Sequence, residues 1–164
     1  MQGNRDIVVE NQGFSLIELI IIILVMGIIM AIAVPSMNNC LTNYQLHAEC
    51  MQLQQHIRSV AQEALVKDSD DFYIRLYLAD DKYGIVAPTG NGNSVMVQLP
   101  VGIDLAFSNF PLDYIRFSGK GKPVVGGSIR LESKRTGRMQ YVIVAAVTGR
   151  TRVSDKPPLS NKVY

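Results

Sequence analysis

An uninterrupted apolar run near the N-terminus constrains this chain more than any other feature. The sixteen residues Leu19–Val34 carry no polar side chain. With its flanking residues, the run approaches the roughly 20 residues needed to cross a hydrocarbon core of about 30 Å. A strand is excluded by this length, and a lone segment in lipid must be helical to satisfy its own backbone hydrogen bonds. The run is therefore a transmembrane helix or the apolar core of a signal peptide.

The flanks of the run bear on these two alternatives. Ala31-Ile32-Ala33 has the small-x-small form of a signal peptidase site. The residues before the run carry Arg5 against Asp6 and Glu10, so they lack the positive charge of a signal peptide. Glu18 lies between the run and Phe14–Ile17, which flank it and are mostly apolar. In a membrane helix a carboxylate costs about 2.5–3.5 kcal/mol near the centre and less near an end. A charge kept in such a place is a candidate for function.

The residues around Glu18 resemble the N-terminus of a type IV prepilin. Gly13-Phe14-Ser15-Leu16-Ile17-Glu18 precedes the apolar run, and Ala33-Val34-Pro35-Ser36 follows it. The prepilin signature is a short hydrophilic leader ending in glycine, then Phe-(Ser/Thr)-Leu-Ile-Glu and a hydrophobic helix. The resemblance implies that prepilin peptidase removes leader residues 1–13 on the cytoplasmic side and that Phe14 becomes N-methylated. It also implies that Glu18 pairs with the N-terminal amine of a neighbouring subunit during filament assembly.

The same resemblance implies a place in the cell. We expect a single-pass protein of the bacterial inner membrane, with its C-terminal domain outside the cytoplasm, that assembles into a pilus or pseudopilus. Its implied partners are prepilin peptidase, inner-membrane lipid and other pilin or pseudopilin subunits. Gly27 and Pro35 both disrupt helices. Two outcomes stay open for this part of the span: a plain kink at Pro35, or loss of helical structure in a filament.

The sequence predicts that the helix continues well beyond the apolar run. Apolar residues recur at helical intervals of three and four, and the polar positions between them are mainly amides and histidines. We expect one helix from Phe14 to about Val66, transmembrane over residues 14–37 and amphipathic over residues 38–67, where it packs on a domain. The cluster Asp68-Ser69-Asp70-Asp71 ends it. The predicted apolar positions are Met37, Leu41, Tyr44, Ala48, Met51, Leu53, Ile57, Val60 and Ala64.

The two cysteines are predicted to be free thiols. Cys40 and Cys50 lie on the same predicted helix, which places them about 15 Å apart along its axis, whereas a disulfide needs Cα atoms roughly 4.4–6.8 Å apart. His47 and His56 lie nearby, but no cluster with metal-ligand spacing forms. We therefore expect neither a metal site nor a cofactor.

The remaining residues predict a small β-rich domain, residues 68–153, and a polar tail, residues 154–164. The clearest hairpin turns at Thr136-Gly137, and Pro88–Asn93 is another turn. The predicted fold is α+β and type IV pilin-like, with the long helix packed on an antiparallel sheet or sandwich. The predicted strands are Phe72–Ala79, Tyr83–Ala87, Ser94–Leu99, Ile103–Phe107, Tyr114–Phe117, Gly127–Lys134, Arg138–Ala146 and Arg150–Val153.

No motif of an enzyme site is found in the sequence. The glycine-containing stretches lack the GxxxxGK[ST] and GxGxxG patterns that bind phosphates, and no serine has a histidine partner close in sequence. Acidic pairs such as Asp80-Asp81 are read as solvated turns. We expect a protein without catalytic residues.

The net charge of +2 hides an uneven distribution. Residues 14–115 carry 4 basic and 10 acidic side chains, whereas residues 116–164 carry 11 basic and 2 acidic ones. The basic end resembles the C-terminal layout of GspH/FimT-type minor pilins and pseudopilins, which close with a hairpin and a turn-strand such as Gly149-Arg150-Thr151-Arg152. In FimT-like minor pilins a Gly-Arg-x-Arg element binds DNA during natural transformation.

This second resemblance names candidate DNA contacts. Arg150 and Arg152 would grip phosphates through their forked guanidinium groups, with Gly149 supplying a tight turn. Four further cations would extend the patch if the hairpin turn and the tail lie on one side: Lys134, Arg135, Arg138 and Lys156.

Two functions remain open at this point. The first is a non-enzymatic minor pilin or pseudopilin of a type IV filament or a type II secretion pseudopilus, in which the basic end meets an acidic face of the next subunit. The alternative is a minor pilin that binds double-stranded DNA for uptake. Secretion, pilus and competence systems share this N-terminal signature.

Overall fold

The computed structural model describes residues 15–86 and 94–158. The predicted cleavage residues Gly13 and Phe14 lie outside these ranges, as do the predicted turn over residues 88–93 and the end of the predicted tail. The chain divides into two units, one up to Asn38 and one from Asn39 onward.

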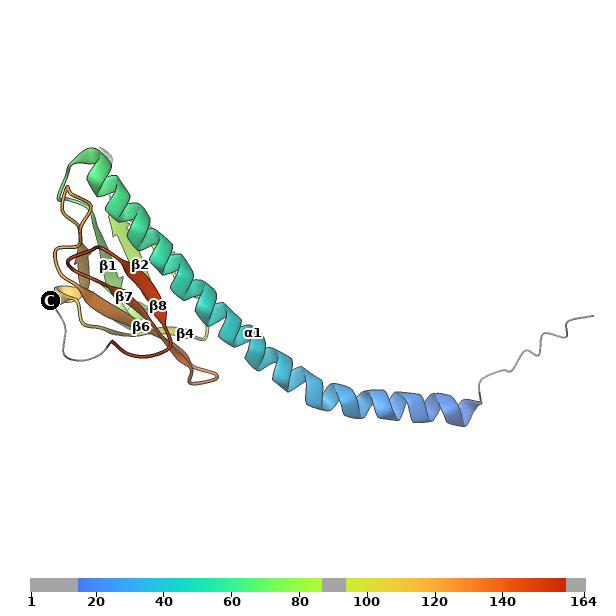
Figure 1. Ribbon diagram of the computed structural model, residues 1–164. Helices are drawn as coiled ribbons and strands as arrows, with labels where there is room; N and C mark the ends of the chain where they lie inside the picture. The colour runs from blue at the N-terminus through green and yellow to red at the C-terminus, as the bar shows by residue number, and fades with distance from the viewer. Residues whose placement is uncertain (1–14, 87–93, 159–164) are drawn as a thin grey trace, which may run out of the picture. The chain divides into compact units, whose positions relative to one another are not determined.

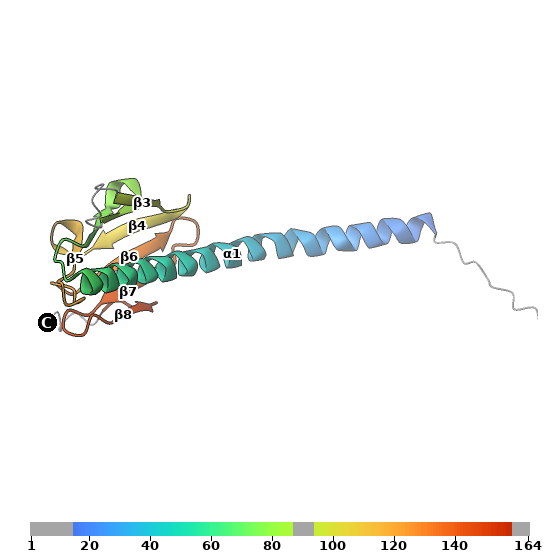
Figure 2. The same ribbon diagram turned by 90° about the horizontal axis from the view of Figure 1, so that it is seen from above.

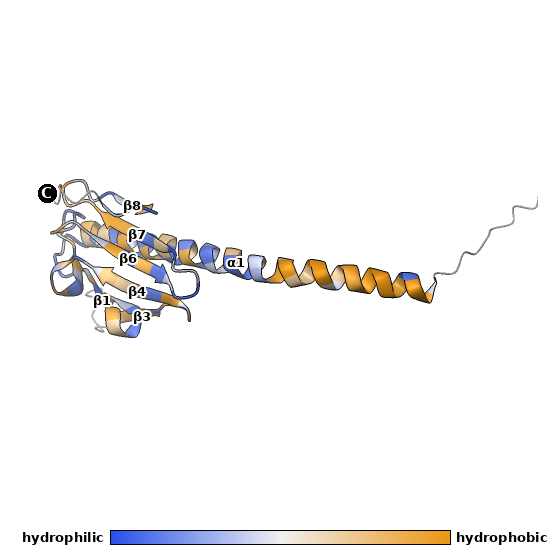
Figure 3. Cartoon of the chain, turned by 90° about the horizontal axis from the view of Figure 1, so that it is seen from below, coloured by the Kyte–Doolittle hydropathy of each residue, from blue (hydrophilic) through white to orange (hydrophobic). Residues whose placement is uncertain are grey.

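The first unit is the apolar part of helix α1 (Leu16–Lys67). Every side chain from Leu16 to Met37 is exposed, and the helix is long and apolar enough to cross a membrane. In the cartoon of Figure 3, almost all of this part of α1 has the colour of hydrophobic residues, whereas the rest of α1 is mixed. Pro35 lies inside the helix, and residues 27–35 are helical. The two alternatives, a plain kink at Pro35 and loss of helical structure in a filament, both stay open.

The second unit contains residues 39–67 of α1 and two antiparallel sheets of four strands each, within the described residues. One sheet has the order β3-β2-β1-β5 and the other β4-β6-β7-β8. This part of α1 runs alongside the sheets (Figure 1, Figure 2). The strands are β1 (Tyr73–Tyr77), β2 (Lys82–Val86), β3 (Ser94–Gln98), β4 (Ile103–Ser108), β5 (Tyr114–Arg116), β6 (Gly127–Ser133), β7 (Met139–Val144) and β8 (Thr151–Ser154).

The predicted α+β fold is confirmed. Each predicted strand is present, with ends that differ by at most two residues. The β2–β3 and β6–β7 pairs are antiparallel hairpins, as predicted. β1 is shorter than predicted because the chain enters a short 3₁₀ helix, η1 (Leu78–Asp80), after which Asp81 takes a left-handed φ of 51°. A second 3₁₀ helix, η2 (Pro111–Asp113), precedes β5.

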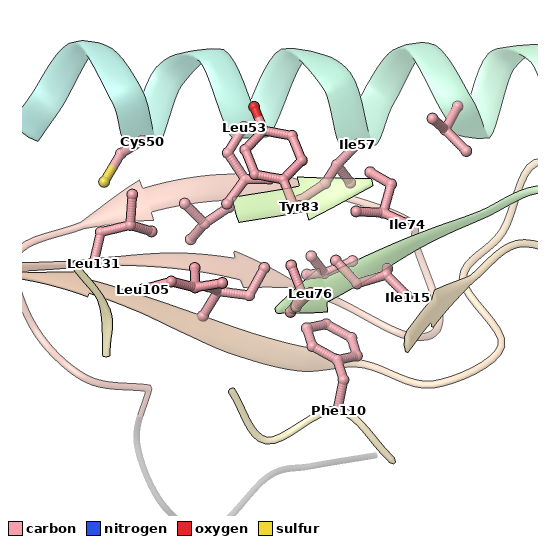
Figure 4. Packing of buried hydrophobic residues seen from close by; sticks show 14 of the residues in the cluster. Cys50, Leu53, Ile57, Ile74, Leu76, Tyr83, Leu105, Phe110, Ile115 and Leu131 are labelled. Carbon is pink, nitrogen blue, oxygen red and sulfur yellow. The ribbon is translucent and has the colours of Figure 1, made fainter. Parts of the chain in front are cut away.

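One stripe along α1 forms the centre of the hydrophobic core. Its members recur every three or four residues, which places them on one face of the helix. They meet Ile74 and Tyr83 of one sheet and Leu105 and Leu131 of the other (Figure 4). Each fully buried leucine or isoleucine contributes about 1.5–3 kcal/mol. The buried residues of the stripe are Leu46, Cys50, Leu53, Ile57, Val60 and Ala64.

The first half of the predicted apolar face is wrong. Leu41, Tyr44 and Met51 have exposed side chains, and Leu46 and Cys50 are buried instead. The two predicted series are out of phase, because the step from Met51 to Leu53 turns the helix by about 200°. Only one series can face the sheets, and the series in phase with Leu53 does so.

Both cysteines are free, as predicted. Cys40 is exposed, whereas Cys50 lies in the buried stripe of α1. Burial raises the pKa of the Cys50 thiol to about 12, and the nearby negative charges of Glu49 and Asp155 add to this effect.

Thiol labelling tests this arrangement. In the full chain in detergent micelles at pH 8, a maleimide should label Cys40 and leave Cys50 unmodified, because roughly one Cys50 thiol in ten thousand is ionised and the group is buried. Denaturation should expose both thiols, as counted by intact mass. Cys40→Ser is the matched control and should abolish labelling of the native protein. Rapid labelling of that variant would contradict the packing of α1.

Candidate functional site

Glu18, the predicted assembly residue, lies in the first turn of α1 and is exposed. A carboxylate in this position interacts favourably with the helix dipole. Because Gly13 and Phe14 lie outside the described residues, their predicted roles and the pairing of Glu18 with an N-terminal amine remain predictions.

The Gly-Arg-Thr-Arg element lies where β7 turns into β8. Gly149 has φ +65°, a left-handed conformation that favours glycine, and its N–H donates to the Ala145 carbonyl at 2.9 Å. Thr151 is buried, whereas Arg150 and Arg152 on either side of it are exposed. Because side chains alternate along an extended strand, the two arginines share the outer side.

Two side chains of α1 hold this element in place, and the sequence analysis missed both. Gln54 Nε2 donates to the Thr151 carbonyl at 2.7 Å. Arg58 donates twice, from Nε to Thr151 Oγ1 at 2.9 Å and from Nη2 to the Thr151 carbonyl at 3.0 Å. These bonds join residues more than ninety positions apart, so no local spacing could reveal them. They fix Thr151 on the inside and thereby leave its neighbours facing solvent.

A loop from a distant part of the sequence also contacts the Gly149 turn. A side chain at Gly149 would come within 3.4 Å of Pro123 Cδ and 3.7 Å of the Gly121 carbonyl oxygen. The same loop carries Lys120 and Lys122, which are exposed. These two lysines were not among the predicted site residues, because they lie about thirty residues earlier in the chain.

The hairpin cations lie at the other end of β7. Lys134, Arg135 and Arg138 belong to the turn between β6 and β7, and the six residues of β7 separate this turn from Gly149 by about 20 Å. Lys156 is exposed and follows the end of β8, which is the end near the same hairpin turn. The structure therefore divides the predicted patch into two groups.

Carboxylates neutralise much of the hairpin group. Lys134 forms ion pairs with Asp104 and, at 3.4 Å, with Asp81, and these bonds raise the pKa of Lys134. Arg138 pairs with Asp155 at 3.3 Å. The pKa of Asp155 is lowered, first by the hydrogen bond from the Gln140 amide and then by the bond from Arg138.

The Arg150–Arg152 group is different. Within residues 15–86 and 94–158, neither arginine has a carboxylate within ion-pair distance. Among these residues, no group of three or more histidine, cysteine, aspartate or glutamate side chains could hold a metal ion. The Arg150–Arg152 group can bind anions, and it contains no group placed for bond-breaking chemistry.

Comparisons with known proteins support the interpretation of the N-terminal motif and that of the fold. The prokaryotic N-terminal methylation motif matches residues 10–34, which contain Gly13, Phe14 and Glu18. The minor pseudopilin EpsH from the type 2 secretion system of Vibrio cholerae has a similar fold, with a TM-score of 0.55. The likeness covers 67% of this chain and 96% of that chain at 14% sequence identity.

The chain thus has the N-terminal methylation motif of type IV prepilins and a pseudopilin-like fold. The motif lies at the N-terminus, and the likeness to EpsH shows the fold over 67% of the chain. No curated protein matches the chain.

The hydrogen bonds from Arg58 to Thr151 predict that Arg58 protects the backbone amides of β8 from exchange. In Arg58→Met the aliphatic stem is kept but two bonds to Thr151 are lost, which should make backbone amides of β8 exchange about tenfold faster. Hydrogen-exchange mass spectrometry measures this directly. Arg135→Met, at an exposed turn position, is the control and should leave β8 unchanged. Equal exchange of β8 in both variants would show that Arg58 does not position the element.

Proposed function

We propose that this chain is a membrane-anchored, non-enzymatic subunit of a type II secretion pseudopilus or a related type IV filament. The observation that carries the proposal is the division of α1. Residues 16–37 have every side chain exposed, whereas residues 46–64 supply the core stripe of a pseudopilin-like domain. The first part of such a helix is suited to lie in lipid or to pack among other helices, and its second part is part of a folded domain.

The dimensions and charges of the helix support this role. Its 22 exposed residues rise by about 33 Å, enough to cross a hydrocarbon core of about 30 Å. Glu18 would be costly in such surroundings without a partner. The amine that cleavage creates at Phe14 of a neighbouring subunit offers an opposite charge, which offsets the burial of both groups. Removal of the leader by prepilin peptidase at the inner membrane would leave the helix in the bilayer and the domain outside the cytoplasm.

The intact mass of the protein purified from membranes tests this processing. We expect a chain that starts at N-methylated Phe14. Gly13→Glu should leave the leader attached, because a bulky charged side chain obstructs the bond to be cut. Gly3→Glu makes the same change at another glycine of the leader and should not affect cleavage. A mature chain starting at Val34 would contradict the proposal, since it would mean export by a signal peptide.

DNA binding is a second candidate function, supported by the Gly149 turn. Arg150 and Arg152 face outward beside each other, and the loop that contacts this turn carries Lys120 and Lys122. Four exposed cations on two segments that contact each other would suit the phosphates of duplex DNA, which carry no sequence information.

The salt dependence of binding tests this second candidate. For the full chain in detergent micelles, the affinity for a labelled DNA duplex should fall steeply with salt, by a slope of about −0.9 per phosphate contact. The double variant Arg150→Gln with Arg152→Gln should make that slope shallower, by the amount that about two phosphate contacts contribute. Arg135→Gln with Arg138→Gln removes the same charge from the opposite end of β7 and is the matched control. An equal loss in both double variants would refute recognition by the Gly149 turn.

A further inference from the structure

The outer face of the β3-β2-β1-β5 sheet carries cations and tyrosines that neither proposed function uses. Side chains alternate along these strands, and Ile74, Leu76, Tyr83 and Ile115 point into the core. The opposite positions of β1, β2 and β5 therefore face outward. They include Tyr73, Arg75, Tyr77, Lys82, Tyr114 and Arg116.

The aromatic rings hold the two arginines in place. Arg75 lies opposite Tyr114 in the pairing of β1 with β5, and its guanidinium carbon is 5.3 Å from the centre of the Tyr114 ring and 4.8 Å from that of Tyr77. The guanidinium carbon of Arg116 is 5.6 Å from the Tyr114 ring centre. Tyr73 packs against Tyr114 with 5.4 Å between ring centres. Tyr114 thus contacts both arginines by cation–π interactions and restricts their conformations.

The positive charge of this face is not balanced. None of the outward-facing positions in the four strands, all of which the structure describes, holds an aspartate or glutamate. Lys82 is paired with Asp80 of η1 at 2.7 Å. Arg75 and Arg116 have no carboxylate within ion-pair distance among the described residues. Two restrained guanidinium groups are therefore available to an external anion.

The spacing of the two arginines indicates what kind of anion fits. Arg75 and Arg116 are diagonal neighbours on adjacent strands, a relation that places their Cα atoms about 7 Å apart. Carboxylates at alternate positions of an extended peptide are also about 7 Å apart. The guanidinium groups lie over the rings of Tyr77 and Tyr114, which leaves less of these two rings for stacking nucleobases. Tyrosine, arginine and methionine, here with the half-exposed Met96 of β3, are also the residues enriched where proteins bind proteins.

We propose that this face docks an extended acidic segment of a partner protein, with Arg75 and Arg116 each binding one of two carboxylates at alternate positions. Tyr114 is the positioning residue, because it holds both guanidinium groups over the sheet. The site lies on a different sheet from the Gly149 turn, and it is independent of both functions proposed above.

Peptide binding to the full chain in detergent micelles tests the docking site. The probe is a labelled synthetic peptide with two aspartates separated by one valine, and its isomer has the aspartates adjacent. Fluorescence anisotropy should show tighter binding of the alternating peptide. Arg75→Gln with Arg116→Gln should weaken it by roughly tenfold or more. Arg135→Gln with Arg138→Gln removes the same charge from the turn between β6 and β7; it is the matched control and should leave binding unchanged.

Two variants of Tyr114 separate positioning from charge. Tyr114→Leu keeps both positive charges but removes the ring, and it should weaken peptide binding several-fold. Tyr114→Phe keeps the ring and should bind like the unaltered chain. Circular dichroism confirms that each variant is folded. The proposal is overturned by equal binding of the two peptides, by no detectable binding, or by equal losses in the two arginine double variants. Tighter binding of single-stranded DNA that depends on Arg75 and Arg116 would assign the face to nucleic acid instead.

Discussion

The second unit depends on the packing of one helical stripe against two sheets. Residues from Leu46 to Ala64 on one side of α1 are buried beside side chains from both sheets, so the helix joins the sheets into a single core. The polar contacts at the margins follow from this packing. On one side, His56 Nδ1 and the Tyr83 hydroxyl share a 2.8 Å hydrogen bond, and burial lowers the pKa of His56. On the other side, Gln54 and Arg58 reach Thr151 and so determine which way Arg150 and Arg152 face. The helix that carries the apolar N-terminal run therefore also positions the Gly149 turn.

Much of this fold is predictable because it rests on local patterns. The apolar run, the two-residue alternation of the strands and the turn at Thr136-Gly137 each act over a few residues, and the strands appear where they are expected. The buried face of α1 is not predictable in the same way. Leu41, Tyr44 and Met51 have a helical spacing as good as that of Leu53, Ile57 and Val60, and only the position of the sheets decides which series is buried. The grouping of cations is likewise a tertiary property. Lys120 and Arg150 belong to segments that contact each other through the Gly149 turn, whereas Arg138 lies about 20 Å away along β7.

The charges of the sequence take on separate roles once they are placed on the fold. The acidic middle of the chain supplies Asp81 and Asp104, which neutralise Lys134, so part of the basic end is used within the domain. Two pairs of arginines without carboxylate partners among the described residues lie on different sheets, Arg150 with Arg152 and Arg75 with Arg116. In the functions proposed above, the apolar part of α1 meets lipid or neighbouring helices, and each arginine pair meets an anionic partner. The net charge of +2 describes neither surface.

In the proposed function, α1 is one helix with two environments, lipid along its first part and the domain core along its second. Spin labels placed singly at positions 19–64, in a variant without its two cysteines and reconstituted in bilayers, test this directly. We predict that labels at every position from Leu19 to Val34 are accessible to oxygen, which concentrates in lipid. From Leu46 to Ala64, accessibility to a water-soluble relaxation agent should instead follow the helical period, with minima at the buried stripe. Periodic protection over Leu19–Val34, or free access of the water-soluble agent there, would contradict the account.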